Sequence, residues 1–338
     1  MSQLRSPRLL ALGVLAAAAL AAPLGLPGAS VVATASAAPA GVAATAVDPV
    51  IDPASTPATD PGTPAVASVE EEHGAFKPET AAATIGAKTV TGPRNVPCTT
   101  PGTSGNRVQA IYAHYGSSAN RIGSLRPYIV DALLRANNIV YYSAKQTGGY
   151  RQLRLATGSD CKPSVAVVNL PASAASSFSG TVSALSARGY TSTARKYVVF
   201  ADARAICGLG QTYNDDQAGR KNRNNRGPQF ARVDLGCWSG NAVAHEIFHT
   251  LGAVQKSAPH SNTSLHCTDE RDVMCYFGAG GSRVSTWSSC STTLLDERLD
   301  CNKNDFFNTS PRTGSYLATR WNTARSAFLW GGGAGYYP

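Results

Sequence analysis

Residues 245–249 read His245-Glu246-Ile247-Phe248-His249, which is an H-E-x-x-H string. On a helix, residues four apart lie on one face, so the two imidazoles can reach one ion at Zn–N distances of about 2.0–2.1 Å. Glu246 lies beside them, where a carboxylate can take the proton of a water whose pKa zinc lowers to about 7. The string therefore predicts a zinc site with His245 and His249 as ligands and Glu246 as the general base.

The segment around this string has the pattern of an amphipathic helix over residues 241–251. Asn241 is a residue type that caps helix N-termini, and Gly252 stands where a glycine often ends a helix. Apolar residues recur on the face opposite the histidines, at Val243, Ile247 and Leu251. We therefore expect this helix to bury one face in the core and to form the floor of a cleft with the other.

Two further features resemble the metzincin clan of zinc peptidases. Gly252 extends the string to H-E-x-x-H-x-x-G, and residues 272–276, D-V-M-C-Y, are similar to the Met-turn of that clan. The tyrosine two residues after the methionine resembles the arrangement in astacins and serralysins, where it can approach the metal and stabilise the oxyanion. The resemblance, which covers roughly residues 241–276, implies that Met274 lies under the metal and that Tyr276 assists catalysis.

The third metal ligand is where the sequence departs from the metzincin pattern. The position three residues after the glycine is Gln255, which is a poor zinc ligand. Two histidines follow, and we predict that a longer loop carries His260 to the metal. His266 is the alternative, and the carboxylates of Asp269 and Asp272 are further options, since carboxylates also bind zinc.

The N-terminal part of the chain has the composition of processing and linker segments. Residues 1–37 join a positive start to an apolar run and small-residue cleavage signals, as a secretory signal peptide does. Residues 38–92 contain few large apolar side chains and are expected to form a disordered linker or pro-region. No later segment approaches membrane-spanning length. We therefore expect a secreted protein whose zinc metallopeptidase domain spans residues 93–338.

All eight cysteines follow the predicted linker. An even number of cysteines in an exported chain indicates disulfides formed in an oxidising compartment, and no pair has the C-x-x-C spacing of a zinc ribbon. Eight cysteines allow about 105 pairings, so the sequence leaves the connectivity open. We predict sequential pairing, Cys98–Cys161, Cys207–Cys237, Cys267–Cys275 and Cys290–Cys301.

The charged residues were considered for two other roles, binding of nucleic acid and binding of a second metal. The formal net charge is +9, and the main basic cluster contains no aromatic side chains on which bases could stack, at Arg220, Lys221, Arg223 and Arg226. We therefore expect a solvated loop there and no nucleic-acid partner. Oxygen-bearing residues between Asp300 and Asp305 resemble part of a calcium loop, which makes Ca²⁺ the candidate for a second metal; a polar turn held by a Cys290–Cys301 bridge is the alternative. The sequence contains no G-x-S-x-G, Walker A or dinucleotide-binding motif.

Periodicity along the chain predicts alternating strands and helices before the H-E-x-x-H segment. Strands are expected at residues 108–115, 151–156, 165–170, 197–201 and 229–235, the last at a sheet edge, and helices at 120–144, 172–188 and 315–330. The predicted fold class is a zincin-like α+β domain. It would combine an N-terminal mixed sheet with helices, the active-site helix, and a loop-rich C-terminal half held by disulfides.

These patterns together predict a secreted zinc endopeptidase that acts on protein or peptide chains and is a monomer. After signal removal we expect no membrane partner. Two alternatives remain open from the sequence. Gln255 allows a non-catalytic binding module on a zincin scaffold, and the same chemistry would serve an amidase acting on cell-wall peptides.

Overall fold

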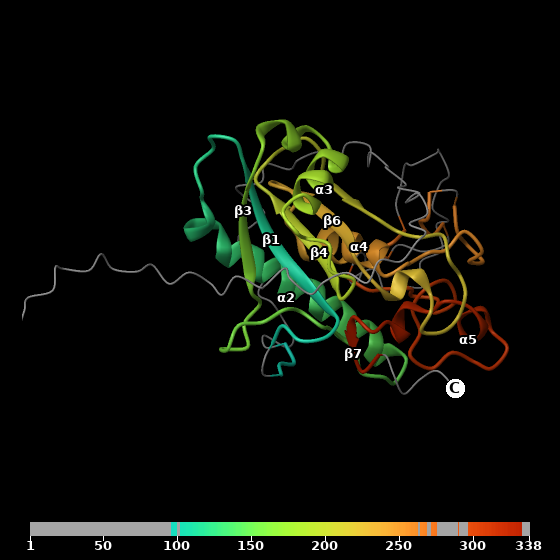
Figure 1. Ribbon diagram of the computed structural model, residues 1–338. Coiled ribbons are helices and arrows are strands. Elements are labelled where there is room, and N and C mark those ends of the chain that lie inside the picture. Colours follow the sequence, from blue (N-terminus) through green and yellow to red (C-terminus); the bar gives the residue numbers. More distant parts are fainter. Residues whose placement is uncertain are drawn as a thin grey trace, which may run out of the picture. The chain divides into compact units, whose positions relative to one another are not determined.

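The computed structural model describes residues 96–99, 102–262, 264–268, 272–275, 290 and 297–332. Within them a five-stranded sheet has the order β3-β1-β4-β6-β5 (Figure 1). Strands β3, β1, β4 and β6 are parallel, and β5 is antiparallel to β6. Their bounds are Arg107–Tyr115 for β1, Val165–Leu170 for β3, Arg195–Ala201 for β4, Gly208–Gly210 for β5 and Gln229–Asp234 for β6. The structure thus confirms a mixed sheet combined with helices.

Helices cover both faces of this sheet, and β1, β4 and β6 are accordingly buried along nearly their whole length. Helices α2 (Ile122–Gln146) and α4 (Gly240–Thr250) pack against each other on one face, and α3 (Phe178–Ser186) covers the other (Figure 1). Because side chains alternate along a strand, β1 contributes to two cores. Val108, Ala110 and Tyr112 join the core with α2 and α4, and Ile111, Ala113 and Tyr115 join the core with α3.

The predicted helix over residues 315–330 is wrong. That region contains the short helix α5 (Tyr316–Thr319), the 3₁₀ turn η3 (Thr323–Arg325) and strand β7 (Leu329–Trp330), which pairs with β2 (Gln152–Leu153). The side-chain oxygen of Asn322 accepts the backbone N–H groups of Asn308 and Ala324 at 3.2 and 3.1 Å. Helix α5 thus ends at Thr319, and Asn322 caps the separate turn η3, which offers the backbone an alternative to helical hydrogen bonds.

The edge of the sheet also differs from the prediction. Residues 229–235 were expected to form an edge strand, but β6 lies between β4 and the short strand β5. Two of the three residues of β5 are glycines, a composition that gives no strand signal in the sequence. The predicted helix over residues 172–188 is interrupted at Ser177, whose side chain caps α3 by accepting the N–H of Gly180 at 3.0 Å.

All eight cysteines lie in the described part of the chain and form four disulfides. The pairs are Cys98–Cys161, Cys207–Cys237, Cys267–Cys275 and Cys290–Cys301, so the prediction of sequential pairing is confirmed. Among the described residues, no helix combines the length and apolar character needed to cross a bilayer. The predicted signal peptide and linker, residues 1–37 and 38–92, lie outside the described residues.

A buried carboxylate fastens the start of α2 to the sheet. Asp202, directly after β4, accepts a hydrogen bond from the Tyr112 hydroxyl at 2.6 Å and pairs with the Arg121 guanidinium. Burial raises the pKa of Asp202, but the hydrogen bonds from Arg121 and Tyr112 outweigh burial and leave its pKa lowered. The folded state therefore binds this proton less readily than the unfolded state does.

We expect Asp202→Asn to lower the free energy of unfolding by about 1 kcal/mol at pH 7, since Arg121 is half exposed and partly screened. Because the folded pKa is the lower one, the contribution of Asp202 is complete above the ordinary value of about 3.9 and is lost progressively as the pH falls from that value through the folded pKa. The variant and the parent should therefore converge in urea unfolding as the pH falls below about 4. Asp131→Asn, which breaks a surface pair with Arg135 on the same helix, should cost less than about 0.5 kcal/mol.

Candidate metal centre

Helix α4 carries the H-E-x-x-H string and has well-defined ends. Its N-cap is Ser239, whose side chain accepts the N–H of Ala242 at 3.3 Å, so the prediction of Asn241 as the cap is wrong. Asn241 instead approaches the Ser239 hydroxyl at 2.5 Å. At the other end, Gly252 has φ +80° and its N–H donates to the His249 carbonyl at 2.8 Å, as a C-terminal glycine does. The helix therefore ends at Thr250, directly after the second histidine.

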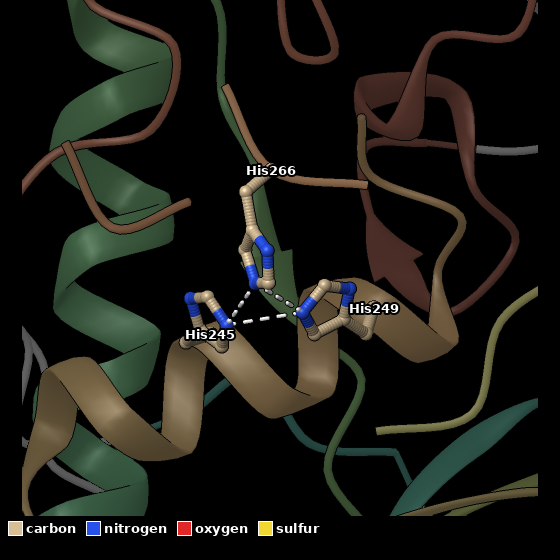
Figure 2. Close-up of side chains that lie close together, drawn as sticks. All are labelled: His245, His249 and His266. Atoms are coloured by element: carbon tan, nitrogen blue, oxygen red, sulfur yellow. Dashed lines mark hydrogen bonds between the residues drawn. The ribbon is translucent and has the colours of Figure 1, made fainter. Parts of the chain in front are cut away.

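Three histidine rings meet beside this helix. His245 and His249 come from successive turns of α4, and His266 approaches from a separate segment (Figure 2). The Nε2 atoms are separated by 3.0 Å for His245 and His249, 3.1 Å for His245 and His266, and 3.2 Å for His249 and His266. All three residues are buried. The structure therefore assembles a group of imidazoles that could hold a metal ion.

The hydrogen-bonding of His245 fixes which nitrogen faces the group. Its Nδ1 lies 2.6 Å from the Val273 carbonyl oxygen, which can only accept, so Nδ1 carries the proton. The Nε2 atom of His245 then presents a lone pair to the other two rings. A backbone carbonyl that orients a ring in this way is a usual companion of a metal-binding histidine.

The spacing of the group fits a tetrahedral metal ion. Three nitrogens bound at about 2.05 Å to one tetrahedral ion are about 3.3 Å apart. The observed Nε2 separations of 3.0–3.2 Å are close to that value. Three protein ligands also leave one position open, as catalytic sites require and structural sites do not.

The third histidine is His266, the alternative to the predicted His260. Its backbone N–H donates to the Asn262 side chain at 2.9 Å, and its carbonyl accepts the Asn262 N–H at 2.8 Å. A β-bridge between Ser261 and Cys267 closes the same turn. These contacts hold the turn so that the ring of His266 reaches α4.

The structure does not bring His260 into the histidine group. Its ring Nδ1 lies 3.1 Å from Oδ2 of Asp305, and its backbone N–H donates to Oδ1 of the same carboxylate at 3.0 Å. Because Ser261 pairs with Cys267, the preceding residue, His260, lies against Asp305 and not against the three histidines. His266 therefore replaces His260 as the third member of the site.

Gln255 has a structural role at the position where metzincins place a ligand. It is buried, its side-chain oxygen accepts the N–H of Asp215 at 2.6 Å, and its amide donates to the carbonyls of Tyr213 and Gly252 at 3.1 and 2.9 Å. Gln255 thereby fastens the segment after β5 to the end of α4. Its side chain is fully occupied by this task.

Glu246 lies between α4 and the edge strand β5. A Cβ atom added at Gly208 would lie 2.4 Å from Oε1 of Glu246, and one added at Gly210 would lie 3.1 Å from Oε2 and 2.7 Å from Cβ of His249. Only glycine therefore allows β5 to approach the carboxylate and the second histidine this closely. The glycines of β5 are site residues that the sequence does not single out, because their importance depends on the packing of β5 against α4.

Of the remaining predicted site residues, Met274 and Asp272 lie in the described part of the chain. Met274 is fully buried, and its N–H donates to the Asp272 carboxylate at 2.7 Å. Asp272 also lies near Cys267 and Cys275, but those cysteines form a disulfide and offer no thiolate to a metal. Tyr276 and Asp269 lie outside the described residues.

The predicted calcium loop has a different organisation. The Asp300 carboxylate accepts backbone N–H groups from Asn304, Asp305, Phe306 and Phe307 at 2.6–3.1 Å. Its oxygens are therefore directed at N–H donors, whereas a calcium site directs oxygens at the ion. Burial raises the pKa of Asp300 although these four hydrogen bonds lower it. The arrangement stabilises a turn and gives no support to calcium.

Known proteins show little similarity to this chain. No protein-family model matches the chain, and no curated protein is similar to it in sequence. Among solved structures, the chain is similar to metalloproteinase-II from Bacteroides fragilis, with 13% sequence identity and a TM-score of 0.29. That match covers 61% of this chain and 57% of the other chain.

Proposed function

We propose that this protein is an exported zinc endopeptidase with a zincin-like fold, and that its site consists of His245, His249, His266 and Glu246. The proposal rests on the convergence of three Nε2 atoms within 3.0–3.2 Å of one another beside a buried glutamate on the same helix. The four disulfides support folding in an oxidising compartment, and therefore secretion.

The three histidines would hold zinc, and zinc in such a site acts as a Lewis acid that lowers the pKa of water to about 7. Glu246 accepts the proton of the attacking water and returns it to the leaving amine. The close approach of β5 limits the positions that the Glu246 carboxylate can take. Tyr276 remains our proposed partner for the oxyanion.

Endopeptidase activity is favoured over a non-catalytic binding module. The binding-module alternative rests on Gln255. A glutamine is a poor zinc ligand, so its presence at the third-ligand position of metzincins suggests a scaffold that no longer binds the metal. In the structure Gln255 holds backbone groups of neighbouring segments, and His266 provides a third imidazole. A scaffold without activity would also have no use for a buried carboxylate at Glu246. We propose that the substrates are proteins or peptides, and that cell-wall peptides are the substrate class to test beside them. We also propose that the protein is a monomer.

Metal content and hydrolysis of an unfolded protein test the proposal together. Protein purified without chelators should contain about one zinc per chain and should cleave a denatured protein substrate. Removal of the metal by a chelator should abolish cleavage, and added zinc should restore it. A metal-free protein that cannot be loaded with zinc, or a zinc-loaded protein without activity on protein and cell-wall peptides, would refute the proposal.

Gly208→Ala should separate the role of Glu246 from that of the metal ligands. The new Cβ would lie 2.4 Å from Oε1 of Glu246 and must displace that carboxylate or move β5 away. We expect kcat to fall about 10²-fold, the lower range for a general base, while zinc affinity changes little. Gly123→Ala in α2, where an added Cβ meets no atom within 4 Å, is the matched control and should keep full activity. Equal activities of the two variants would contradict the placement of Glu246 under β5.

A further inference from the structure

The Cys267–Cys275 disulfide joins two segments that support different histidines of the metal centre. On one side, Cys267 directly follows His266 in the chain. On the other side, Cys275 closes the segment that contains Val273, whose carbonyl holds the ring of His245 at 2.6 Å. One covalent bond thus fixes both a ligand and the group that orients another ligand.

A backbone hydrogen bond also joins these two segments. The Cys267 N–H donates to the Met274 carbonyl at 3.2 Å, which is a long hydrogen bond. The Asp272 carboxylate accepts the Met274 N–H at 2.7 Å, but that contact lies within one segment. Both cysteines are buried, at 0% and 6% exposure, so the bridge belongs to the interior beside the histidines.

We propose that the Cys267–Cys275 disulfide completes the metal site, so that the chain binds zinc tightly only after these two thiols have been oxidised. This inference rests on the proposed function. In the oxidation, two thiols lose two protons and two electrons to a disulfide exchange partner, which becomes a dithiol, and one S–S bond forms. Before that step the segments of His266 and Val273 are joined by the main chain and by hydrogen bonds such as that from the Cys267 N–H to the Met274 carbonyl, which hold the three Nε2 atoms less firmly at the spacing that zinc requires.

The other bridges provide a matched control. Cys98–Cys161 joins residue 98, ahead of β1, to residue 161, ahead of β3, and neither cysteine adjoins a histidine of the site. Its removal costs conformational stability in the same way as removal of any bridge does. It therefore separates a general loss of stability from a specific loss of metal binding.

The experiment measures zinc affinity by competition with a chromophoric chelator for the parent protein, C267A/C275A and C98A/C161A. We expect C267A/C275A to bind zinc about 10–100-fold more weakly, the usual effect of losing groups that orient metal ligands. C98A/C161A should stay within about threefold of the parent, because it changes no such group. Circular dichroism of each apoprotein establishes that it is folded.

Several outcomes would overturn the inference. Unchanged affinity in C267A/C275A, or equal losses in both double variants, would show that this bridge has no specific part in the site. If C267A/C275A does not fold, C267A/C275V, which restores buried volume, takes its place. Failure of both to fold while C98A/C161A folds would make the bridge a determinant of the fold and not of the metal site. A parent protein that binds no zinc would overturn the proposed function and this inference together, whereas the other outcomes leave the proposed function intact.

Discussion

His266→Ala should lower zinc affinity by roughly 10³-fold or more, beyond the 10–100-fold expected for groups outside the ligand set. Removal of this imidazole leaves only His245 and His249, whose Nε2 atoms are 3.0 Å apart on α4. Two ligands complete half of a tetrahedral site, so the metal would be exposed to water and exchange readily. Competition with a chromophoric chelator measures the affinity, and the thermal unfolding of the apoprotein shows whether the variant is folded.

His260→Ala is the matched control for that experiment, because it removes a histidine only six positions away. Its ring contacts Asp305 and not the histidine group. We expect a fall of less than about tenfold, caused by a looser turn before His266. The reverse order of the two affinities would restore His260 as the third ligand and would refute the arrangement of the site.

Glu246→Gln should lower kcat by about 10²–10⁴-fold on a protein substrate. Glutamine has nearly the same shape as glutamate, so it fits under β5 beside Gly208 and should leave zinc content and melting temperature unchanged. It cannot accept a proton from water, and this difference isolates the general base. Full hydrolysis by a zinc-loaded Glu246→Gln variant would exclude Glu246 from the proton transfer.

Glu246→Asp and Asp131→Asn complete the comparison. Aspartate keeps a carboxylate, but its side chain is one methylene shorter and places that carboxylate further from the attacking water. We therefore expect an activity between that of the parent and that of the glutamine variant. Asp131 is 43% exposed on α2, where it pairs with Arg135, and its replacement should leave kcat unchanged. A loss of activity in the Asp131 variant would point to a general effect of lost charge.

The sequence allowed the prediction of features that depend on neighbouring residues. His245, Glu246 and His249 lie within five residues, so the geometry of one helix determines their relation. The strand over β1 and the helix over α2 were predicted for the same reason, because a regular pattern of apolar residues extends along each of them.

Features that depend on distant contacts were missed or misassigned. The choice between His260 and His266 is made by the Ser261–Cys267 bridge and by Asp305, which lies 45 residues beyond His260. Strand β5 has only three residues and exists because it pairs with β6. The C-terminal helix was predicted from apolar spacing, whereas α5 ends at Thr319 and the side chain of Asn322 caps a separate 3₁₀ turn.

The order of the four disulfides has a consequence for how the chain can be assembled. Their closed loops follow one another along the sequence without nesting or interlacing, since Cys161 precedes Cys207, Cys237 precedes Cys267, and Cys275 precedes Cys290. Each loop can therefore close as soon as its second cysteine becomes available, independently of all residues further along the chain. A polypeptide that emerges from its N-terminus can form every native bridge in turn, and no correct pair has to be broken to admit a later one.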